Sequence, residues 1–107
     1  MLDNLRKTVC GANRQMFSEN LVSGTCESVS GVDRKTGNVV IKPADIAFDQ
    51  LTPDRMIVVS LETGERIDGD MDPTPDTPIH LEIYRAFDVG AVAHAHSLHA
   101  TAWAQAK

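Results

Sequence analysis

The sequence lacks the features that membrane-spanning, secreted and nucleic-acid-binding proteins usually require. No window of its 107 residues approaches the roughly 20 consecutive apolar residues that cross a bilayer. The first ten residues, MLDNLRKTVC, have neither the apolar run nor the cleavage pattern of a signal peptide. Acidic residues outnumber basic ones by 15 to 10, and no basic cluster offers phosphate groups a positive field. These absences predict a cytoplasmic protein with no membrane partner and no nucleic-acid partner.

Cysteine is also scarce. Cys10 and Cys26 are too few for a disulfide framework and lack the spacing of a metal motif, so we interpret them as two isolated thiols. The composition, with 42% hydrophobic and 23% charged residues, is that of an ordinary globular domain. We therefore expect residues 1–107 to form a single domain with a hydrophobic core of its own.

Helical spacing of apolar residues predicts two helices. In the stretch from Leu2 to Met16 apolar positions recur every three or four residues, and Asp3 or a neighbour stands where a helix cap is needed. Asp76 or Thr77 is placed to cap a second helix, with Pro78 in its first turn. The buried stripe of that second helix is expected to consist of four apolar residues, Ile79, Ile83, Tyr84 and Phe87.

Short apolar runs between turn residues predict strands. A strand around Val29 is expected to break at Gly31, and the turn over residues 32–38 leads directly into Val39-Val40-Ile41, which makes a hairpin. Lys42-Pro43 should end this second strand, because proline cannot donate a ladder hydrogen bond.

Two further strands are predicted, over residues 56–61 and 89–96, and Ser97 is placed to cap a third helix that starts at Leu98. The order of these elements favours an α/β fold, a layered α/β/α domain with a mostly antiparallel sheet.

The pair His94-x-His96 is the first candidate for chemistry. Side chains two residues apart in a strand project from the same face about 7 Å apart, so the two imidazoles can share one metal ion. A catalytic zinc usually takes three protein ligands, and the carboxylate of Asp76 offers an oxygen that suits zinc or manganese. Two alternatives stay open at this point: a partly exposed histidine pair on an edge strand, and an Asp76 that only caps its helix.

Four motifs occur together and in order along the chain, and together they are far more specific than any one alone. They are Val29-Ser30-Gly31-Val32-Asp33-Arg34, Ile41-Lys42-Pro43, Asp76-Thr77-Pro78-x-His80 and His94-x-His96-Ser97-x-His99-Ala100-Thr101. Over nearly its whole length the chain resembles the first half of the L-ribulose-5-phosphate 4-epimerase and class II aldolase family, which includes the adducin head domain. The resemblance implies a class II aldolase-like fold in truncated form.

The same resemblance implies a zinc site. By this likeness His94 and His96 are zinc ligands, and Asp76 stands where the epimerases have an aspartate at the metal and the aldolases a glutamate. Asp76 is thus implied to be catalytic as well as metal-binding, and its identity favours an epimerase. In the family the metal stabilises an enediolate of the substrate, which lowers the barrier to carbon–carbon bond cleavage. His80 and His99 are interpreted as structural.

Substrate binding is implied for Ser28, Lys42 and Thr74. A sugar phosphate is the expected partner, although Lys42 is equally compatible with a solvated lysine at a strand end. The family holds the phosphate with small polar pairs that here read Glu27-Ser28, Ala44-Asp45 and Thr74-Pro75. Two added carboxylates would repel a phosphate dianion, which weakens the expectation of phosphate recognition.

The family's third histidine ligand, its acid/base aspartate and its tyrosine come from sequence beyond position 107. The resemblance therefore predicts an L-ribulose-5-phosphate 4-epimerase-like protein that is incomplete and inactive by itself. The alternatives are a class II sugar-phosphate aldolase-like protein, a noncatalytic module like the adducin head, and one half of a complementing pair. Family members are usually homotetramers, so a homo-oligomer is the implied assembly.

Overall fold

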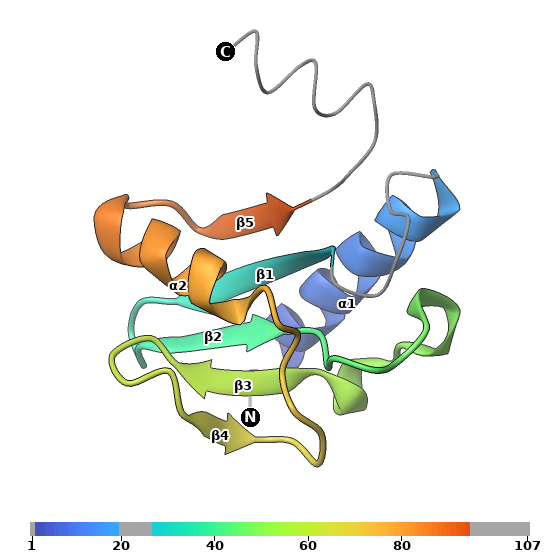
Figure 1. The fold of residues 1–107 in the computed structure, drawn as a ribbon, viewed down its shortest axis with the longest axis horizontal. Helices are drawn as coiled ribbons and strands as arrows, with labels where there is room; N and C mark the ends of the chain where they lie inside the picture. Colours follow the sequence, from blue (N-terminus) through green and yellow to red (C-terminus); the bar gives the residue numbers. More distant parts are fainter. Residues whose placement is uncertain (1, 20–26, 95–107) are drawn as a thin grey trace, which may run out of the picture.

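The computed structural model describes residues 2–19 and 27–94. Its elements, in chain order, are α1 (Asp3–Ser18), β1 (Ser28–Asp33), β2 (Asn38–Ile41), two short 3-10 turns (Phe48–Gln50 and Pro53–Arg55), β3 (Ile57–Ser60), β4 (Arg66–Asp68), α2 (Thr77–Ala86) and β5 (Ala91–His94). The strands form one sheet in the order β4-β3-β2-β1-β5, and every pairing in it is antiparallel (Figure 1). This confirms the predicted α/β class and the antiparallel sheet.

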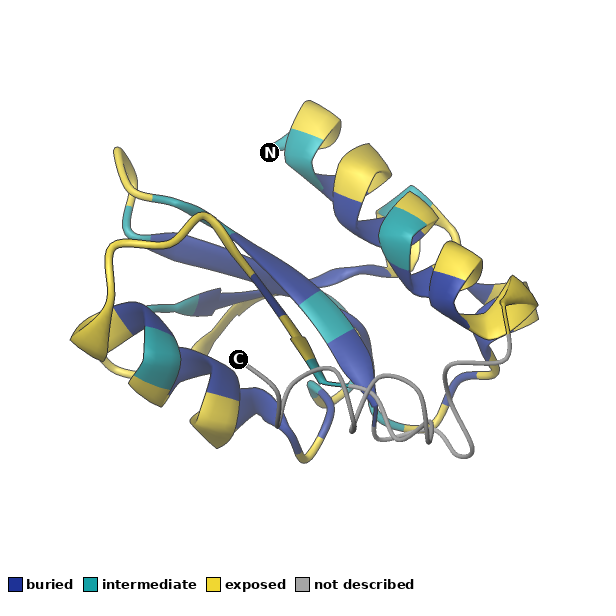
Figure 2. Cartoon of the chain, turned by 90° about the horizontal axis from the view of Figure 1, so that it is seen from above, coloured by how far each residue is buried: buried dark blue, intermediate teal, exposed yellow. Residues whose placement is uncertain are grey.

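The two helices cover opposite faces of the sheet, which gives the predicted α/β/α layers (Figure 2). The strands divide their side chains between these faces because successive residues of a strand alternate. Val40 and Val58 pack with Val9 on the α1 side. Their neighbours in sequence, among them Val39 and Val59, pack on the α2 side. Each face of the central strands is therefore apolar, which explains why β2 and β3 appear as continuous hydrophobic runs.

Strand β1 does not break at Gly31, so that prediction was wrong: the strand continues to Asp33. A Cβ atom at Gly31 would lie 2.8 Å from Cδ1 of Leu5 and 2.9 Å from Cγ2 of Val9. Because glycine has no side chain, α1 can pack closely against the strand at this point. The glycine serves helix packing rather than chain reversal.

Asn13 of α1 fixes the start of β1. Its side-chain amide donates to the carbonyl of Val29 at 2.9 Å and accepts from the Val29 N–H at 2.8 Å. Pairing between β1 and β2 begins only at Gly31↔Val40, so the amide takes the place of a strand partner where β1 extends beyond it. The fully buried Asn13 thereby ties α1 to the strand segment that carries Ser28.

The predicted buried stripe of α2 was partly wrong. Tyr84 is buried as expected, but Ile79 and Phe87 are 53% and 63% exposed. The face against the sheet instead holds Thr77, His80 and Leu81 together with Tyr84. Thr77 and His80 are polar; Thr77 bonds to the loop before the helix and His80 contacts β1. Hydrophobicity alone could not identify them as buried.

Arg34 closes the C-terminal end of α2. Its guanidinium donates to the carbonyl oxygens of Tyr84, Phe87 and Val89 at 2.9 to 3.1 Å. Carbonyls in the last turn of a helix have no partner within the helix, so a cation there is favourable. This contact explains the arginine of the Val32-Asp33-Arg34 motif as a structural residue.

Three sequence predictions extend past the described part of the chain. The predicted strand over residues 89–96 is described only as β5, which ends at His94. Its continuation to His96 and the helix expected after Ser97 lie outside the described residues, as does Cys26. In residues 2–19 and 27–94, neither helix is long and apolar enough to cross a membrane.

Candidate metal and substrate site

The predicted site residues within the described part of the chain converge at one end of the sheet. Ser28, at the start of β1, is the register partner of His94 on β5. On the other side of β1, the N–H of Thr74 donates to the carbonyl of Lys42 at 3.0 Å, just after β2 ends. This bond anchors the loop that leads to Asp76 and α2. Four elements therefore bring together residues that are distant in the sequence.

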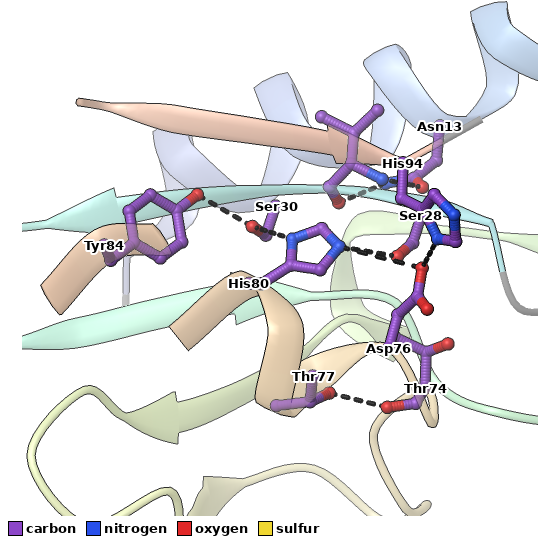
Figure 3. A network of polar contacts seen from close by, with 10 residues as sticks. Asn13, Ser28, Ser30, Thr74, Asp76, Thr77, His80, Tyr84 and His94 are labelled. Carbon is purple, nitrogen blue, oxygen red and sulfur yellow. Dashed lines mark hydrogen bonds and ion pairs between the residues drawn. The ribbon is translucent and has the colours of Figure 1, made fainter. Parts of the chain in front are cut away.

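The central contact joins the carboxylate of Asp76 to the imidazole of His94 (Figure 3). Oδ2 of Asp76 pairs with Nδ1 of His94, and the two side chains are 9% and 33% exposed. Asp76 occupies the N-cap position of α2, but its side chain makes no capping hydrogen bond. The carboxylate is thus directed at the histidine, and the interpretation of Asp76 as a helix cap alone does not fit this geometry.

A buried chain of polar groups lies behind this pair. The hydroxyl of Tyr84 contacts Oγ of Ser30 at 2.7 Å, and Ser30 contacts Nδ1 of His80 at 2.6 Å. The other ring nitrogen of His80, Nε2, lies 3.1 Å from Oγ of Ser28 and 4.0 Å from Oδ2 of Asp76. Figure 3 shows these groups in one row that ends at the Asp76 carboxylate.

His80 is neutral at physiological pH. Burial lowers the pKa of His80 to about 4, because the charged ring loses its water; the nearby Asp76 carboxylate opposes this shift, and His94 adds to it. Burial likewise raises the pKa of the Tyr84 hydroxyl. The chain from Tyr84 to His80 is therefore a set of uncharged hydrogen-bonding groups.

Sequence reasoning treated His80 as structural, and it is fully buried. Its contact with the site was nevertheless open to prediction. Asp76 and His80 are spaced i, i+4 on a helix, which places them on one face, and Ser28 and Ser30 alternate onto one face of their strand. These two pairs of residues meet where α2 packs against β1.

The three residues predicted to bind substrate are all buried. Ser28, Lys42 and Thr74 have exposed fractions of 0%, 0% and 1%. The Lys42 ammonium donates to the carbonyl of Pro43 at 2.9 Å and lies 5.0 Å from the ring centroid of Phe48. Lys42 is therefore not the solvated lysine that one alternative described. A substrate-binding role for these three residues stays a prediction.

The donor atoms of Asp76 and His94 suit a divalent metal ion. A carboxylate oxygen and an imidazole nitrogen already meet, and a catalytic zinc commonly uses such ligands. Residues 2–19 and 27–94 contain no group of three such ligands. The predicted third ligand, His96, lies outside the described residues. The ligand roles of Asp76, His94 and His96 stay a prediction.

A family model, the class II aldolase and adducin N-terminal domain, matches residues 7–107. The chain belongs to this family. The fold agrees: an L-fuculose 1-phosphate aldolase superposes with a TM-score of 0.85 at 23% sequence identity. YgbL from Escherichia coli, described as a candidate aldolase/epimerase/decarboxylase, gives 0.81 at 28% identity. The L-fuculose-1-phosphate aldolase of Thermus thermophilus gives 0.73 at 24% identity.

This class II aldolase family member spans about half the length of these solved relatives. The three matches cover 95%, 94% and 95% of this chain, but only 48%, 47% and 51% of theirs. The predicted family and its class II aldolase-like fold are confirmed.

Proposed function

We propose that this chain supplies the carboxylate and histidine part of a zinc site for sugar-phosphate chemistry of the L-ribulose-5-phosphate 4-epimerase type. The observation that carries the proposal is the direct contact between Asp76 and His94, which come from different elements and are 18 positions apart. His96, two residues further along, is the proposed third ligand. Membership of the class II aldolase family supports this interpretation.

Zinc, when bound, acts as a Lewis acid that polarises carbonyl and hydroxyl oxygens of a substrate. The residues of this chain hold and shape the site. Asp76 and His94 are the ligands, and the short connection from α2 back to β5 keeps them adjacent. Asp76 is also the residue that favours an epimerase over an aldolase, since the resemblance places aspartate at this position in epimerases. A class II aldolase activity is the alternative chemistry.

For the substrate, we propose that Ser28, Lys42 and Thr74 form the floor of a sugar-phosphate site. The buried Lys42 ammonium contributes positive charge to that site; it donates to the carbonyl of Pro43 and lies 5.0 Å from the ring centroid of Phe48. Glu27, which is 5% exposed, introduces negative charge beside Ser28. We therefore expect weaker phosphate binding here than in a site that lacks this carboxylate.

We further propose a cytoplasmic homo-oligomer, as the family resemblance implies. A second candidate function is a noncatalytic interaction module, as in the adducin head. The observation that favours it is the altered set of phosphate-binding pairs, in which Glu27, Asp45 and Pro75 replace groups that suit a phosphate. The two functions differ in whether the chain needs a metal.

Zinc binding by the purified chain tests the proposal. The metal-free protein is titrated with zinc in competition with a chromophoric chelator, alongside Asp76→Asn, His94→Ala and the control Asp72→Asn. Asp72 is a matched control because its side chain is 92% exposed and pairs with Arg66 at the surface. We expect about one zinc per chain, an affinity loss of about tenfold or more in the first two variants, and no change in the control.

A wild-type chain that binds no zinc would contradict the proposed metal site and favour the noncatalytic module. Equal affinities for the wild type, Asp76→Asn and His94→Ala would show that zinc binds elsewhere on the chain, which also contradicts it.

A further inference from the structure

We propose that His80 is a positioning residue that holds the carboxylate of Asp76 in the orientation its ligand role requires. This inference rests on the proposed function. His80 has no exposed surface, and its side-chain contacts are with Ser28, Ser30 and Asp76. It lies next to both residues that frame the site: Nε2 is 3.1 Å from Oγ of Ser28 and 4.0 Å from Oδ2 of Asp76.

The backbone makes this arrangement rigid. Asp76 and His80 are one helical turn apart, and the His80 N–H donates to the Asp76 carbonyl at 3.2 Å. Ser28 lies on β1 directly opposite His94 in the β5 register. His80 thus contacts the element that carries the carboxylate ligand and the strand that pairs with the histidine ligand. A side chain in this position fixes the distance between the two.

Two tautomers of His80 fit the distances of the hydrogen-bond chain, and the charge of Asp76 favours the one with the hydrogen on Nε2. In that tautomer the Ser30 hydroxyl donates to Nδ1, which lies 2.6 Å away, and the Tyr84 hydroxyl donates to Ser30. Nε2 then carries the hydrogen and donates to Ser28, with its positive end toward the Asp76 carboxylate. The opposite tautomer would turn the Nε2 lone pair toward that negative charge, which is electrostatically unfavourable.

This direction of donation has a consequence for Asp76. His94 contacts Oδ2 of Asp76 directly, and the positive Nε2–H end of His80, 4.0 Å from the same oxygen, attracts that oxygen electrostatically and so favours this orientation of the carboxylate. Partners that orient a ligand in this way commonly change metal affinity by about 10-fold to 100-fold when they are removed. His80 therefore acts on metal affinity through Asp76 and not through contact with the metal.

The first experiment determines the tautomer in the metal-free full chain. Nitrogen-15 NMR of the histidine rings at pH 7 distinguishes a protonated Nε2 from a protonated Nδ1, and the signal missing from His80→Gln identifies His80. We expect the hydrogen on Nε2. A hydrogen on Nδ1 would overturn the proposal, and this test does not depend on whether any metal binds.

The second experiment compares zinc dissociation constants of two matched variants. In His80→Gln the side-chain amide reaches the position of Nε2 and keeps the donor toward Ser28 and Asp76. In His80→Asn the shorter amide reaches only the position of Nδ1 and loses that donor. We expect a zinc affinity within about threefold of wild type for Gln and a loss of about tenfold for Asn.

Stability measured by urea unfolding separates positioning from a structural role. If His80 only supports the fold, both substitutions should lower the free energy of unfolding and leave the two zinc affinities alike. Equal zinc affinities in His80→Gln and His80→Asn, with a wild-type chain that binds zinc, would overturn the positioning role alone. A wild-type chain without zinc affinity would instead contradict the proposed function.

Discussion

Acidification is predicted to destabilise the metal-free protein through His80. This ring is fully buried, and burial lowers its pKa to about 4 from an ordinary value of 6.5. As the pH falls below about 6.5 the unfolded chain takes up a proton at this histidine, while the folded chain does not. The contribution of neutral His80 to the free energy of unfolding is therefore fully present above about pH 6.5 and is lost progressively as the pH falls to about 4.

The size of the effect follows from the difference between the two pKa values. Each unit corresponds to about 1.4 kcal/mol in the free energy of unfolding. Between pH 7 and pH 5 the contribution of His80 should fall by about 2 kcal/mol, and by about 3 kcal/mol once the pH is below 4. These are large fractions of the total stability expected for a chain of this size, about 5 to 15 kcal/mol.

Urea unfolding of the metal-free chain at pH 7, 6 and 5 measures this contribution. His80→Gln is the reference because glutamine does not titrate, so groups common to both proteins cancel in the difference. We expect the wild type to lose about 2 kcal/mol more than His80→Gln between pH 7 and pH 5. Parallel pH profiles for the two proteins would refute the reasoning, since they would mean that folding leaves the proton affinity of His80 unchanged.

Three single substitutions, at Gly31, Gly11 and Asn13, allow further tests of the fold. Gly31→Ala should cost about 1 to 3 kcal/mol in the free energy of unfolding, because the new Cβ would lie 2.8 Å from Leu5. Gly11 is an exposed helical position with no atom within 4 Å of an added Cβ, so Gly11→Ala should instead raise the free energy of unfolding by about 0.5 to 1 kcal/mol. Equal effects of the two glycine substitutions would contradict the packing of α1 on β1. Asn13→Ala should cost about 1 to 3 kcal/mol because it leaves the N–H and C=O of Val29 without the bonds that Asn13 supplies. Hydrogen exchange at the Val29 amide should accelerate in that variant, and unchanged exchange would show that other groups protect it.

Much of the fold could be predicted from the sequence because local signals agreed with tertiary packing. The first helix carries apolar residues at helical spacing, and β2 and β3 are short apolar runs next to turn residues. Strand β4 was missed because its residues Arg66–Asp68 are all exposed and only Ile67 among them is apolar, so they carry no burial signal. Its pairing with β3 depends on the register of the neighbouring strand, which a local window does not contain.

The site was predictable to a different extent. Motif order identified Asp76 and His94, and the structure brings their side chains into contact. The role of α2 was harder to predict, because a helix that buries His80 and Thr77 against a sheet looks less amphipathic than one that buries only apolar residues. The expected stripe through Ile79 and Phe87 followed hydrophobicity alone and selected the exposed side. Hydrogen-bonding partners on β1 decide which face of α2 turns inward.

Strand β5 is the outermost strand of the described sheet on the side of β1, and it carries His94 at its end. A border strand offers its backbone N–H and C=O groups to any extended segment that comes alongside. A segment docked there would lengthen the sheet and shield the Asp76–His94 pair from water in the same step. At the proposed metal site we therefore expect metal affinity to rise when an extended segment pairs with β5.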